Sequence, residues 1–566
     1  MFILWSRDRN INRLFFASYL VPRKYVIITG GVISGLGKGI LSASIARLLK
    51  SRGFNVTAVK IDPYVNVDAG TLRPTEHGEV WVTDDGGEID QDLGHYERFL
   101  NISLPKKNNL TTGQIYQQVI DNERLGKYLG KTVEIIPHIT DEIKRRIRAV
   151  GDENTDFVIV EIGGTVGDYQ NVPFLEAVRQ MRFEDEEHVV FVHLVFVPVP
   201  SHLGEAKTKP AQHSTRELMG MGIHPDFVVC RTPSHLDQAR RDKIALFCNV
   251  KPQHIISAPD VGTIYEVPLL LEAQQFSTKI LNVLDTPPLK SNMHEWARVV
   301  NAIKSANKEI VIGMVGKYVN TGDFTLADSY VSVNEALHHA GAHHNVRVRI
   351  NWIDASSIDR EGVFDGVDGI LVPGGFGSSG VEGKIKAIQY AREHEIPFLG
   401  LCFGLQLAVV EFARNVVGLD ADSTETNTLT KHPVICVLPD QKNVLAQSRY
   451  GASMRLGAYP AVLAKDSRVS RMYGSGEVSH RHRHRYEVNP AYHKQLSEAG
   501  LVFSGRSPDG LLVEFIELPN HPFFVGTQAH PEFSSRFEAP EPLFSAFVAA
   551  CAKELEQVER LPHNAK

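Results

Sequence analysis

Short apolar runs alternate with stretches of helical periodicity over the first half of the chain. The runs are VIITG, NVTAVK, FVIVEIGG, HVVFVHLVFV and FVVCR, spread from residue 26 to about residue 232. Runs that are apolar at nearly every position are typical of a parallel sheet covered by helices on both faces. The first half is therefore predicted to be a doubly wound α/β domain.

A second α/β series follows after a break. The proline pair Pro287 and Pro288 interrupts the pattern, MHEWARVVNAIKSAN predicts one linking helix, and strand-like runs resume with EIVIGMVGKY, VRVRINWID, GILVPGG, PFLGLCFG and FFVGTQAHPE. We predict an extension over residues 1–22, a first domain over 23–286, a linker over 287–308 and a second doubly wound domain over 309–566.

Composition narrows the class of protein. A chain of 566 residues is too long for one core. The net charge of −6 gives no general reason to bind nucleic acid or an anionic membrane. Five scattered cysteines without C-x-x-C spacing favour a reducing compartment and argue against structural zinc. We therefore expect a cytoplasmic enzyme with no nucleic-acid or membrane partner.

The first twenty or so residues are expected to be a loosely attached extension. Charges interrupt the apolar pieces of MFILWSRDRNINRLFFASYLV, so a signal peptide is not indicated. An amphipathic helix that binds a membrane or a partner stays open as an alternative, because Leu14, Phe15, Phe16 and Leu20 would share one face.

The sequence VIITGGVISGLGKGI, residues 26–40, predicts a strand, a glycine-rich loop and a helix start. Such a loop directs backbone N–H groups at an anion, and Lys38 adds a positive charge, so the expected ligand is ATP. Gly39 stands where a phosphate loop usually has the Ser or Thr that holds magnesium. Another side chain must then hold the metal. A glycine turn without a ligand is the alternative.

Two carboxylates are candidates for that metal site. Asp92 lies in DQDLGHYERF, and Glu161 closes the apolar run FVIVEIGG. A carboxylate that follows a strand in a phosphate-loop sheet can bind Mg2+ in place of the missing hydroxyl. Taken singly, each is more often a solvated surface carboxylate, and the pair becomes a candidate only together with the loop.

A basic segment offers a second phosphate site. KTKPAQHS, residues 207–214, places two lysines on either side of a threonine and next to a proline that restricts the backbone. Two cations held close together suit a second phosphate chain. The alternative is an exposed basic loop.

The second half contains a candidate nucleophile. Cys402 sits between Gly400 and Gly404 in PFLGLCFGLQ, the small-residue spacing of a strand-to-helix nucleophile turn. His530 and Glu532 in GTQAHPEF supply a base and a carboxylate that orients it. This set predicts attack on a carboxamide with release of ammonia. A buried cysteine and an unrelated His–Glu pair are the alternative.

One further segment, HRHRHR at residues 480–485, is compatible with a metal or nucleic-acid site. Because the chain is acidic and no aromatic residues interleave, the better interpretation is one arginine that clamps a substrate carboxylate.

In order along the chain, these motifs resemble the CTP synthase family. The resemblance runs from residue 24 to about residue 552 and rests on TGGVISGLGKG, KIDPYVNVDAGT, HGEVWVTDDGGEIDQDLGHYERF, EIGGTVGD, KTKPAQHS, KIALFCNV, PGGFG, GLCFGLQ, HRHRYEVN and HPEF. It implies a P-loop-like amidoligase domain followed by a class I glutaminase domain. The implied reaction is ATP-dependent amination of UTP to CTP, through a 4-phosphorylated UTP, with ammonia released from L-glutamine.

The resemblance also implies residue roles. Cys402, His530 and Glu532 would be catalytic, and Asp92 and Glu161 would hold Mg2+. ATP would be bound by Gly35, Leu36, Gly37, Lys38, Gly39, Ile40, Asp92, Pro259, Asp260 and Val261. UTP or CTP would be bound by Ser34, Asp168, Tyr169, Gln170, Lys207, Thr208, Lys209, Pro210, Ala211, Gln212 and Lys243. Glutamine would be bound by Gly375, Phe403, Gly404, Leu405, Gln406, Glu425 and Arg485.

Regulation and assembly are implied in the same way. The family is stimulated by GTP, inhibited by CTP and assembles as a homotetramer, with filaments a further form left open. This chain has Ser379 where the family commonly has arginine, which leaves the GTP response open. Gln170 replaces a usual glutamate, which leaves the strength of CTP feedback open. Phe403 replaces leucine, with little expected effect because its backbone N–H is the donor.

Two other functions are alternatives to this one. A different ATP-dependent glutamine amidotransferase, acting on a carboxylate, would share the loop and the triad but would have no use for KTKPAQHS with Lys243. A non-catalytic assembly relative would have no need of Cys402, His530 and Glu532.

Overall fold

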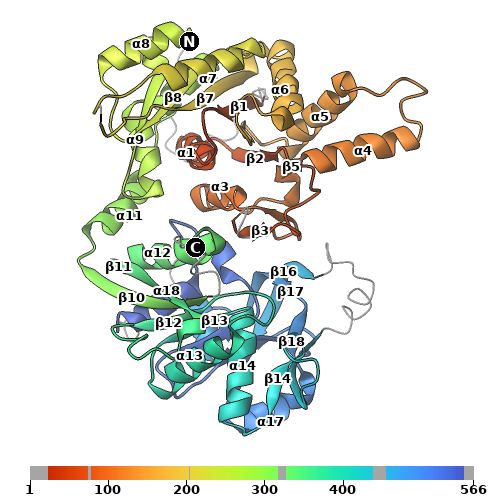
Figure 1. Cartoon of the computed structure of the whole chain (residues 1–566), viewed down its shortest axis with the longest axis vertical. Coiled ribbons are helices and arrows are strands. Elements are labelled where there is room, and N and C mark those ends of the chain that lie inside the picture. Colours follow the sequence, from red (N-terminus) through yellow and green to blue (C-terminus); the bar gives the residue numbers. More distant parts are fainter. Residues whose placement is uncertain (1–22, 74–77, 203, 317–326, 438–453, 554–566) are drawn as a thin grey trace, which may run out of the picture.

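The computed structural model describes residues 23–73, 78–202, 204–316, 327–437 and 454–553. The predicted extension over residues 1–22, with its candidate amphipathic helix, lies outside the described residues. Figure 1 shows two α/β halves stacked on one another and connected by α11 (His294–Ser305), the predicted linking helix. No helix in the described residues has the length and apolar character needed to cross a bilayer.

The first half is built on a sheet of seven strands that all pair in parallel, in the order β5-β2-β6-β1-β7-β8-β9. In chain order the strands are β1 (Lys24–Gly30), β2 (Val56–Asp62), β5 (Asn109–Thr111), β6 (Phe157–Ile162), β7 (Val189–Phe196), β8 (Phe227–Thr232) and β9 (Ile255–Pro259). A short antiparallel hairpin, β3 (Val80–Val82) and β4 (Glu88–Asp90), stands apart from this sheet.

Helices cover both faces of that sheet, as the continuous apolar runs predict. The helices are α1 (Lys38–Ser51), α3 (Asp92–Leu100), α4 (Thr112–Arg124), α5 (Thr140–Val150), α6 (Val172–Glu184), α7 (Lys209–Gly220), α8 (Gln238–Cys248), α9 (Val267–Ala273) and α10 (Phe276–Val283). Along β1, Val26 and Ile28 pack with α1 and α3, whereas Tyr25 and Ile27 pack with α5 and α6. Alternate residues of one strand thus enter two separate cores.

The second half is built on a nine-stranded mixed sheet in the order β11-β10-β12-β13-β21-β20-β19-β16-β17. Its parallel part contains the predicted strands β10 (Lys308–Gly316), β11 (Val346–Asp354), β12 (Gly369–Val372), β13 (Phe398–Leu401) and β21 (Phe524–Thr527). The sheet continues antiparallel through β20 (Val513–Glu517), β19 (Val502–Arg506), β16 (Arg455–Leu463) and β17 (Glu477–His484). The sequence pattern did not predict this antiparallel extension.

Two layers of helices and a small sheet complete the second half. The helices are α12 (Val331–His343), α13 (Val381–Glu393), α14 (Phe403–Asn415), α16 (Arg468–Tyr473), α17 (His493–Glu498) and α18 (Pro542–Cys551). The small sheet contains β14 (Ala421–Ser423), β15 (His432–Val437) and β18 (Tyr486–Val488). In β13, Phe398 packs in the core with α13 and α14, and Leu399 packs in the core with α12 and α18.

The two halves share an apolar core. Trp81 of the hairpin lies 4.9 Å from Phe533, measured between ring centroids. Tyr265 stacks on Phe537 at 4.0 Å with the ring planes nearly parallel. Because these buried aromatic pairs join residues far apart in the sequence, the halves are packed together as one continuous structure.

Candidate functional site

The phosphate loop has the backbone conformation that its glycines predict. It runs from the end of β1 to the first residue of α1, with φ of 69° at Gly35 and 101° at Gly37, a region that side chains with a Cβ rarely adopt. Loop residues Gly35, Leu36, Gly37 and Ile40 line a cavity of about 300 Å3. Pro259 and Val261, from the far edge of the sheet, line the same cavity, so the two predicted ATP segments meet.

Lys38 is aimed into the sheet edge beside this loop. Its Nζ donates a hydrogen bond to the carbonyl of Gly164 at 2.8 Å. Burial lowers the pKa of Lys38, and the nearby carboxylate of Glu161 opposes that shift. Lys38 therefore lies near the carboxylate of Glu161, at the ends of the strands.

Gly39 has a steric reason for lacking a side chain. A Cβ at this position would lie 2.4 Å from Oδ1 of Asp92, the first residue of α3. The carboxylate of Asp92 thus fills the space that the Ser or Thr hydroxyl takes in the usual phosphate loop.

A buried lysine organises the carboxylates next to the loop. Lys60 Nζ lies 3.3 Å from Asp62, 3.5 Å from Asp90 and 3.9 Å from Glu161, and it forms an ion pair with Asp92. Burial alone would lower the pKa of Lys60, but these carboxylates raise it well above its usual value. Tyr96 of α3 also donates a hydrogen bond to Glu161.

Sequence reasoning missed Lys60, Asp62 and Asp90. The signal was present, because a lysine and an aspartate inside the apolar run VTAVKIDP have no place in a core without charged partners. Asp92 and Glu161, which the sequence did indicate, come together around this lysine.

The donor set suits Mg2+ bound together with a nucleotide. Within the described residues, no three His, Cys, Asp or Glu side chains are grouped as a metal site of their own. Mg2+ is usually held by one or two carboxylates, with phosphate oxygens and water as the other ligands. Asp92 and Glu161 offer such oxygens at the end of the phosphate loop, where they already surround a cation.

The structure has the predicted strand-to-helix turn at Cys402. Cys402 joins β13 to α14 with φ 49° and ψ −98°, a strained conformation for a residue with a side chain. A Cβ on Gly400 would lie 2.8 Å from the backbone of Gly404, and one on Gly404 would lie 2.1 Å from the carbonyl of Val372. Both glycines are therefore required for the turn to close.

His530 and Glu532 form a pair beside the thiol. His530 Nδ1 and Glu532 Oε1 are 2.7 Å apart, and the histidine also hydrogen bonds to Cys402. Burial by itself lowers the pKa of His530, but the charges of Glu532 and Cys402 raise it to about 10. The raised pKa favours the imidazolium form of His530 beside the sulfur of Cys402.

Gln528 is a further contact of the sulfur that sequence reasoning missed. Its amide Nε2 donates to Cys402 Sγ at 3.6 Å, and its Oε1 accepts from Gln406 at 3.3 Å. Gln406 also donates to the carbonyl of Tyr486 at 2.9 Å. A polar side chain at the end of the apolar run FFVGTQ, two residues before the predicted base His530, is the feature of the sequence that could have indicated it.

A cavity of about 540 Å3 opens above Cys402. Of the predicted glutaminase residues, Gly375, Cys402, Arg485, His530 and Glu532 line it. Gly70, Thr71, Leu72, Glu79 and Val80 of the first half line it as well. The cavity thus belongs to both halves of the chain.

Other predicted glutamine contacts lie behind the cavity. Phe403, Gly404 and Leu405 form the buried first turn of α14, where backbone N–H groups have no partner within the helix. Glu425 Oε1 accepts a hydrogen bond from the backbone N–H of Gly377 at 2.7 Å, so it braces the loop that contains Gly375.

The HRHRHR segment divides its side chains between two faces of β17. His480, His482 and His484 are buried in the second half, and burial lowers the pKa of each, to about 4 for His480. Arg481 and Arg483 bind carboxylates of the first half, Glu97 at 2.9 Å and Glu88 at 2.8 Å. Arg485, which follows the strand, lines the cavity.

Comparisons with known proteins agree with this arrangement. A family model described as CTP synthase N-terminus matches residues 24–286, and one described as glutamine amidotransferase class-I matches residues 325–550. The CTP synthase of Methanococcus maripaludis is 52% identical over 540 residues, which is 93% of this chain and 99% of that protein. The chain belongs to the CTP synthase family.

A second curated relative gives the same result. The CTP synthase of Saccharolobus solfataricus is 53% identical and covers 94% of this chain and 100% of its own length. A solved structure, the Trypanosoma brucei CTPS glutaminase domain with bound acivicin, is 38% identical over 43% of this chain and 94% of its own, with a TM-score of 0.40.

Family membership confirms the predicted fold class and reaction. CTP synthases are glutamine-hydrolysing ligases that convert UTP to CTP with ATP as co-substrate. The two-domain α/β class is confirmed, and the alternative of a different amidotransferase acting on a carboxylate is set aside.

The segments that the CTP synthase resemblance assigns to UTP surround α7. Thr208 and Gln212 are buried at its start, with Gln212 donating to Thr208 Oγ1 at 3.0 Å. Glu205 accepts a hydrogen bond from Lys207 at 3.1 Å and pairs with Arg240 at 3.5 Å; that hydrogen bond, together with the positive charges of Lys207, Arg240 and Lys243, lowers the pKa of its carboxyl. A Cβ on Gly31 would meet Ser214, so α7 packs directly on the phosphate loop.

The remaining CTP synthase assignments are on exposed turns. Ser34 is exposed in the phosphate loop, and Tyr169 is 94% exposed. Asp168 accepts a hydrogen bond from the backbone of Thr165 at 2.7 Å. Gly167 packs against Glu217 of α7, which brings the turn with Asp168, Tyr169 and Gln170 to the same helix.

Proposed function

We propose that this chain divides CTP synthesis between two sites, a kinase-like site over residues 23–286 and a glutaminase site over residues 309–566, with residues 287–308 as their linker. The cavity above Cys402 carries the proposal, because residues of both halves line it. Ammonia released at the cysteine would enter a space that already reaches the first half.

In the glutaminase step, the sulfur of Cys402 attacks the carboxamide carbon of glutamine. The imidazolium of His530 gives its proton to the leaving amine, so that ammonia departs and a thioester remains for water to hydrolyse to glutamate. The backbone N–H groups of Gly375 and Phe403 stabilise the oxyanion. Gln406, Glu425 and Arg485 hold the substrate, with the guanidinium of Arg485 on its carboxylate.

In the amidoligase step, the uracil O4 of UTP takes the γ-phosphoryl group of ATP, and ammonia then displaces phosphate from C4. Gly35 to Ile40 cradle the phosphates, and Lys38 neutralises charge on the transferred group. Pro259, Asp260 and Val261 bind the adenine side. Asp92 and Glu161 would hold Mg2+, which when bound would neutralise the negative charge of the phosphate oxygens.

For the second nucleotide, Ser34, Lys207 to Gln212 and Lys243 bind UTP, and Asp168, Tyr169 and Gln170 bind CTP as feedback inhibitor. The packing of α7 on the phosphate loop supports this placement, since it brings the two triphosphates to one sheet edge. Gln170 stands where the family usually has a glutamate, so that site has one negative charge fewer. The strength of CTP feedback therefore has to be measured for this chain.

Stimulation by GTP, assembly as a homotetramer and a cytoplasmic location complete the proposal. Ser379 is exposed just before α13, where an arginine would add a cation, so a weak GTP response is expected. Leu129, at 89% exposed, and Leu125, at 71%, give an apolar surface next to α4 that self-assembly would cover. Light scattering at several protein concentrations tests the tetramer.

The direct test is CTP formation from UTP and ATP, with glutamine or with ammonium chloride as nitrogen source, in the presence and absence of GTP. Both nitrogen sources are expected to support CTP formation only when ATP, UTP and Mg2+ are all present. Glutamine hydrolysis without any CTP formation from either source would contradict the proposal.

A further inference from the structure

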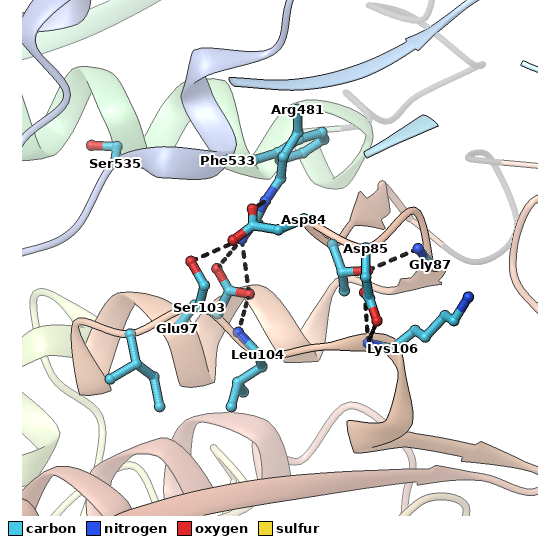
Figure 2. A network of polar contacts seen from close by, with 12 residues as sticks. Asp84, Asp85, Gly87, Glu97, Ser103, Leu104, Lys106, Arg481, Phe533 and Ser535 are labelled. Atoms are coloured by element: carbon cyan, nitrogen blue, oxygen red, sulfur yellow. Dashed lines mark hydrogen bonds and ion pairs between the residues drawn. The ribbon is translucent and has the colours of Figure 1, made fainter. Parts of the chain in front are cut away.

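A fully buried carboxylate of the first half is bound by two arginines of the second. Glu97 lies on α3, and its side chain has no exposed surface. Arg481 Nη2 lies 2.9 Å and Arg536 Nη2 lies 2.6 Å from Glu97 Oε2, and the other oxygen accepts from the backbone of Leu104 at 2.9 Å. Figure 2 shows Arg481 reaching across from the second half to Glu97 and Asp84.

Arg481 connects this carboxylate to the backbone of the catalytic histidine. Arg481 belongs to β17, and its main-chain carbonyl accepts the hydrogen bond of the backbone N–H of His530 at 2.8 Å. The position of the histidine therefore depends on where the guanidinium of Arg481 is anchored. Glu97 and Asp84, both in the first half, are its anchors.

Arg536 connects the same carboxylate to the segment that contains Glu532. Its Nη1 donates to the carbonyl of Phe533 at 2.7 Å and to that of Ser535 at 3.2 Å. These carbonyls belong to, or directly follow, the short helix Pro531–Ser534 on which Glu532 lies. Glu97 thus binds both arginines that fix the backbone on either side of the His530–Glu532 pair.

The charges make this arrangement sensitive to the loss of one group. Arg481 and Arg536 are both buried, and each has a positive charge that Glu97 offsets. If Glu97 becomes neutral, the two buried guanidinium groups lose the carboxylate that they share, and Arg481 keeps its ion pair with the half-exposed Asp84. Removing one member of a buried charge network is more disruptive than replacing the network as a whole.

The helix that contains Glu97 also reaches the phosphate site. Asp92, in its first turn, pairs with Lys60, and Tyr96 donates to Glu161. One helix, α3, therefore contributes both to the charged cluster beside the phosphate loop, through Asp92 and Tyr96, and to the arginines of the second half, through Glu97.

We propose that Glu97, which belongs to the amidoligase half, is a positioning residue for the glutaminase. It keeps His530 and Glu532 correctly placed relative to Cys402. It touches neither substrate nor sulfur and acts through Arg481 and Arg536. This inference rests on the proposed glutaminase role of Cys402 and adds a residue from the other half of the chain to that site.

The test compares Glu97→Gln with Glu411→Gln in the full-length chain. Glu411 is an equally buried carboxylate bound to Arg392 at 2.8 Å, on the far end of α14, with no contact to the catalytic pair. Since displacing a catalytic group by about 1 Å can cost about 100-fold, Glu97→Gln is expected to lower kcat for glutamine hydrolysis by about 10- to 100-fold. KM for glutamine and CTP formation from ammonium should stay within about twofold, because Gln406, Arg485 and the ATP site are unchanged.

Two readouts separate positioning from a general loss of stability. Alkylation of Cys402 by iodoacetamide should slow in Glu97→Gln, because the imidazolium of His530 is no longer held next to the sulfur. The alkaline limb of the glutaminase pH profile should move to lower pH, because a looser contact with Glu532 lowers the pKa of His530. Glu411→Gln should leave both readouts as in the wild type.

Wild-type glutaminase activity in Glu97→Gln, or equal losses in the glutamine and ammonium reactions, would overturn the inference. So would the same glutaminase defect in Glu411→Gln. If Glu97→Gln does not fold, Asp84→Asn decides, because its half-exposed side chain binds only Arg481 of the pair; an unchanged ratio of glutamine to ammonium activity would overturn the inference. Failure of the proposed function would differ, since Cys402→Ala would then still hydrolyse glutamine.

Discussion

The turn at Cys402 and the phosphate loop are both strand-to-helix turns rich in glycine, yet they are stabilised in different ways. The turn at Cys402 is fixed by backbone sterics, because a Cβ added to Gly400 or Gly404 would lie within 3 Å of neighbouring backbone atoms. The phosphate loop leaves open space at Gly35 and Gly37, and its surroundings are fixed by charge, through Lys60 and its carboxylates. One site is complete before substrate arrives, and the other is arranged around a cation.

This difference predicts how each site responds to its ligand. The hydrogen bond between His530 and Glu532 is already formed at 2.7 Å, so the glutaminase needs little rearrangement to act. Asp92 and Glu161 are instead engaged by Lys60, Tyr96 or both. On the proposed assignment, a nucleotide with its Mg2+ competes for these carboxylates, so substitutions there should affect binding as well as turnover.

The largest expected effect comes from Cys402→Ala. It removes the nucleophile, so glutamine-dependent CTP formation should fall by about 1,000-fold or more. CTP formation from ammonium should be unchanged, because the phosphate loop is intact. Parallel assays with the two nitrogen sources check this, and a loss of both activities would show that the two sites are not separate.

Lys38→Ala should have the next largest effect. Loss of the cation that faces the transferred phosphoryl group is expected to lower CTP formation from both nitrogen sources by about 100-fold. Glutamine hydrolysis on its own should persist. The measurement is CTP formation and glutamate release on the same samples, and a glutaminase defect alone would contradict the assignment of Lys38.

Glu532→Gln tests the preformed pair through its pH dependence. The charge of Glu532 helps raise the pKa of His530 to about 10, and the neutral amide removes that contribution. The protonated imidazole, which the leaving amine requires, is then lost at a lower pH, so the alkaline limb of glutaminase kcat/KM moves to lower pH. An unchanged alkaline limb would mean that another group titrates there.

Gln528→Leu should give the smallest effect. It removes the amide that donates to Cys402 Sγ while keeping the volume of the buried side chain. A hydrogen bond worth ~1 kcal/mol corresponds to about a fivefold fall in glutaminase kcat/KM. Asn at the same position is the matched control, since it keeps an amide but shortens its reach; equal activity of Leu and wild type would exclude a role for this bond.

Features with a local cause could be predicted from the sequence. The glycines of the phosphate loop and of the turn at Cys402 are needed for backbone conformations within a few residues, so their spacing indicated both turns. The strand runs of the parallel parts were recognisable because both faces are buried. The assignment of substrate contacts came from family resemblance and stays a prediction.

Features that depend on contacts between distant segments were not predictable. Glu97 and Arg481 are separated by 384 residues, and neither has a local sequence pattern that indicates the other. Lys60 stands out in its apolar run, but nothing in the sequence indicates that Asp90 and Asp92 fold against it. Strands β16 and β17 mix buried, partly buried and exposed positions without a regular pattern, and their antiparallel pairing is set by the whole sheet.

The central claim is that ammonia made at Cys402 is used by the other half of the chain. The most direct measurement supplies glutamine labelled with 15N at its amide, together with UTP, ATP and an equal concentration of unlabelled ammonium near pH 7, and determines the label at the 4-amino group of CTP. The account predicts that the product is predominantly labelled, because ammonia passes through the shared cavity. A product whose nitrogen matches the mixed pool of the medium would contradict it.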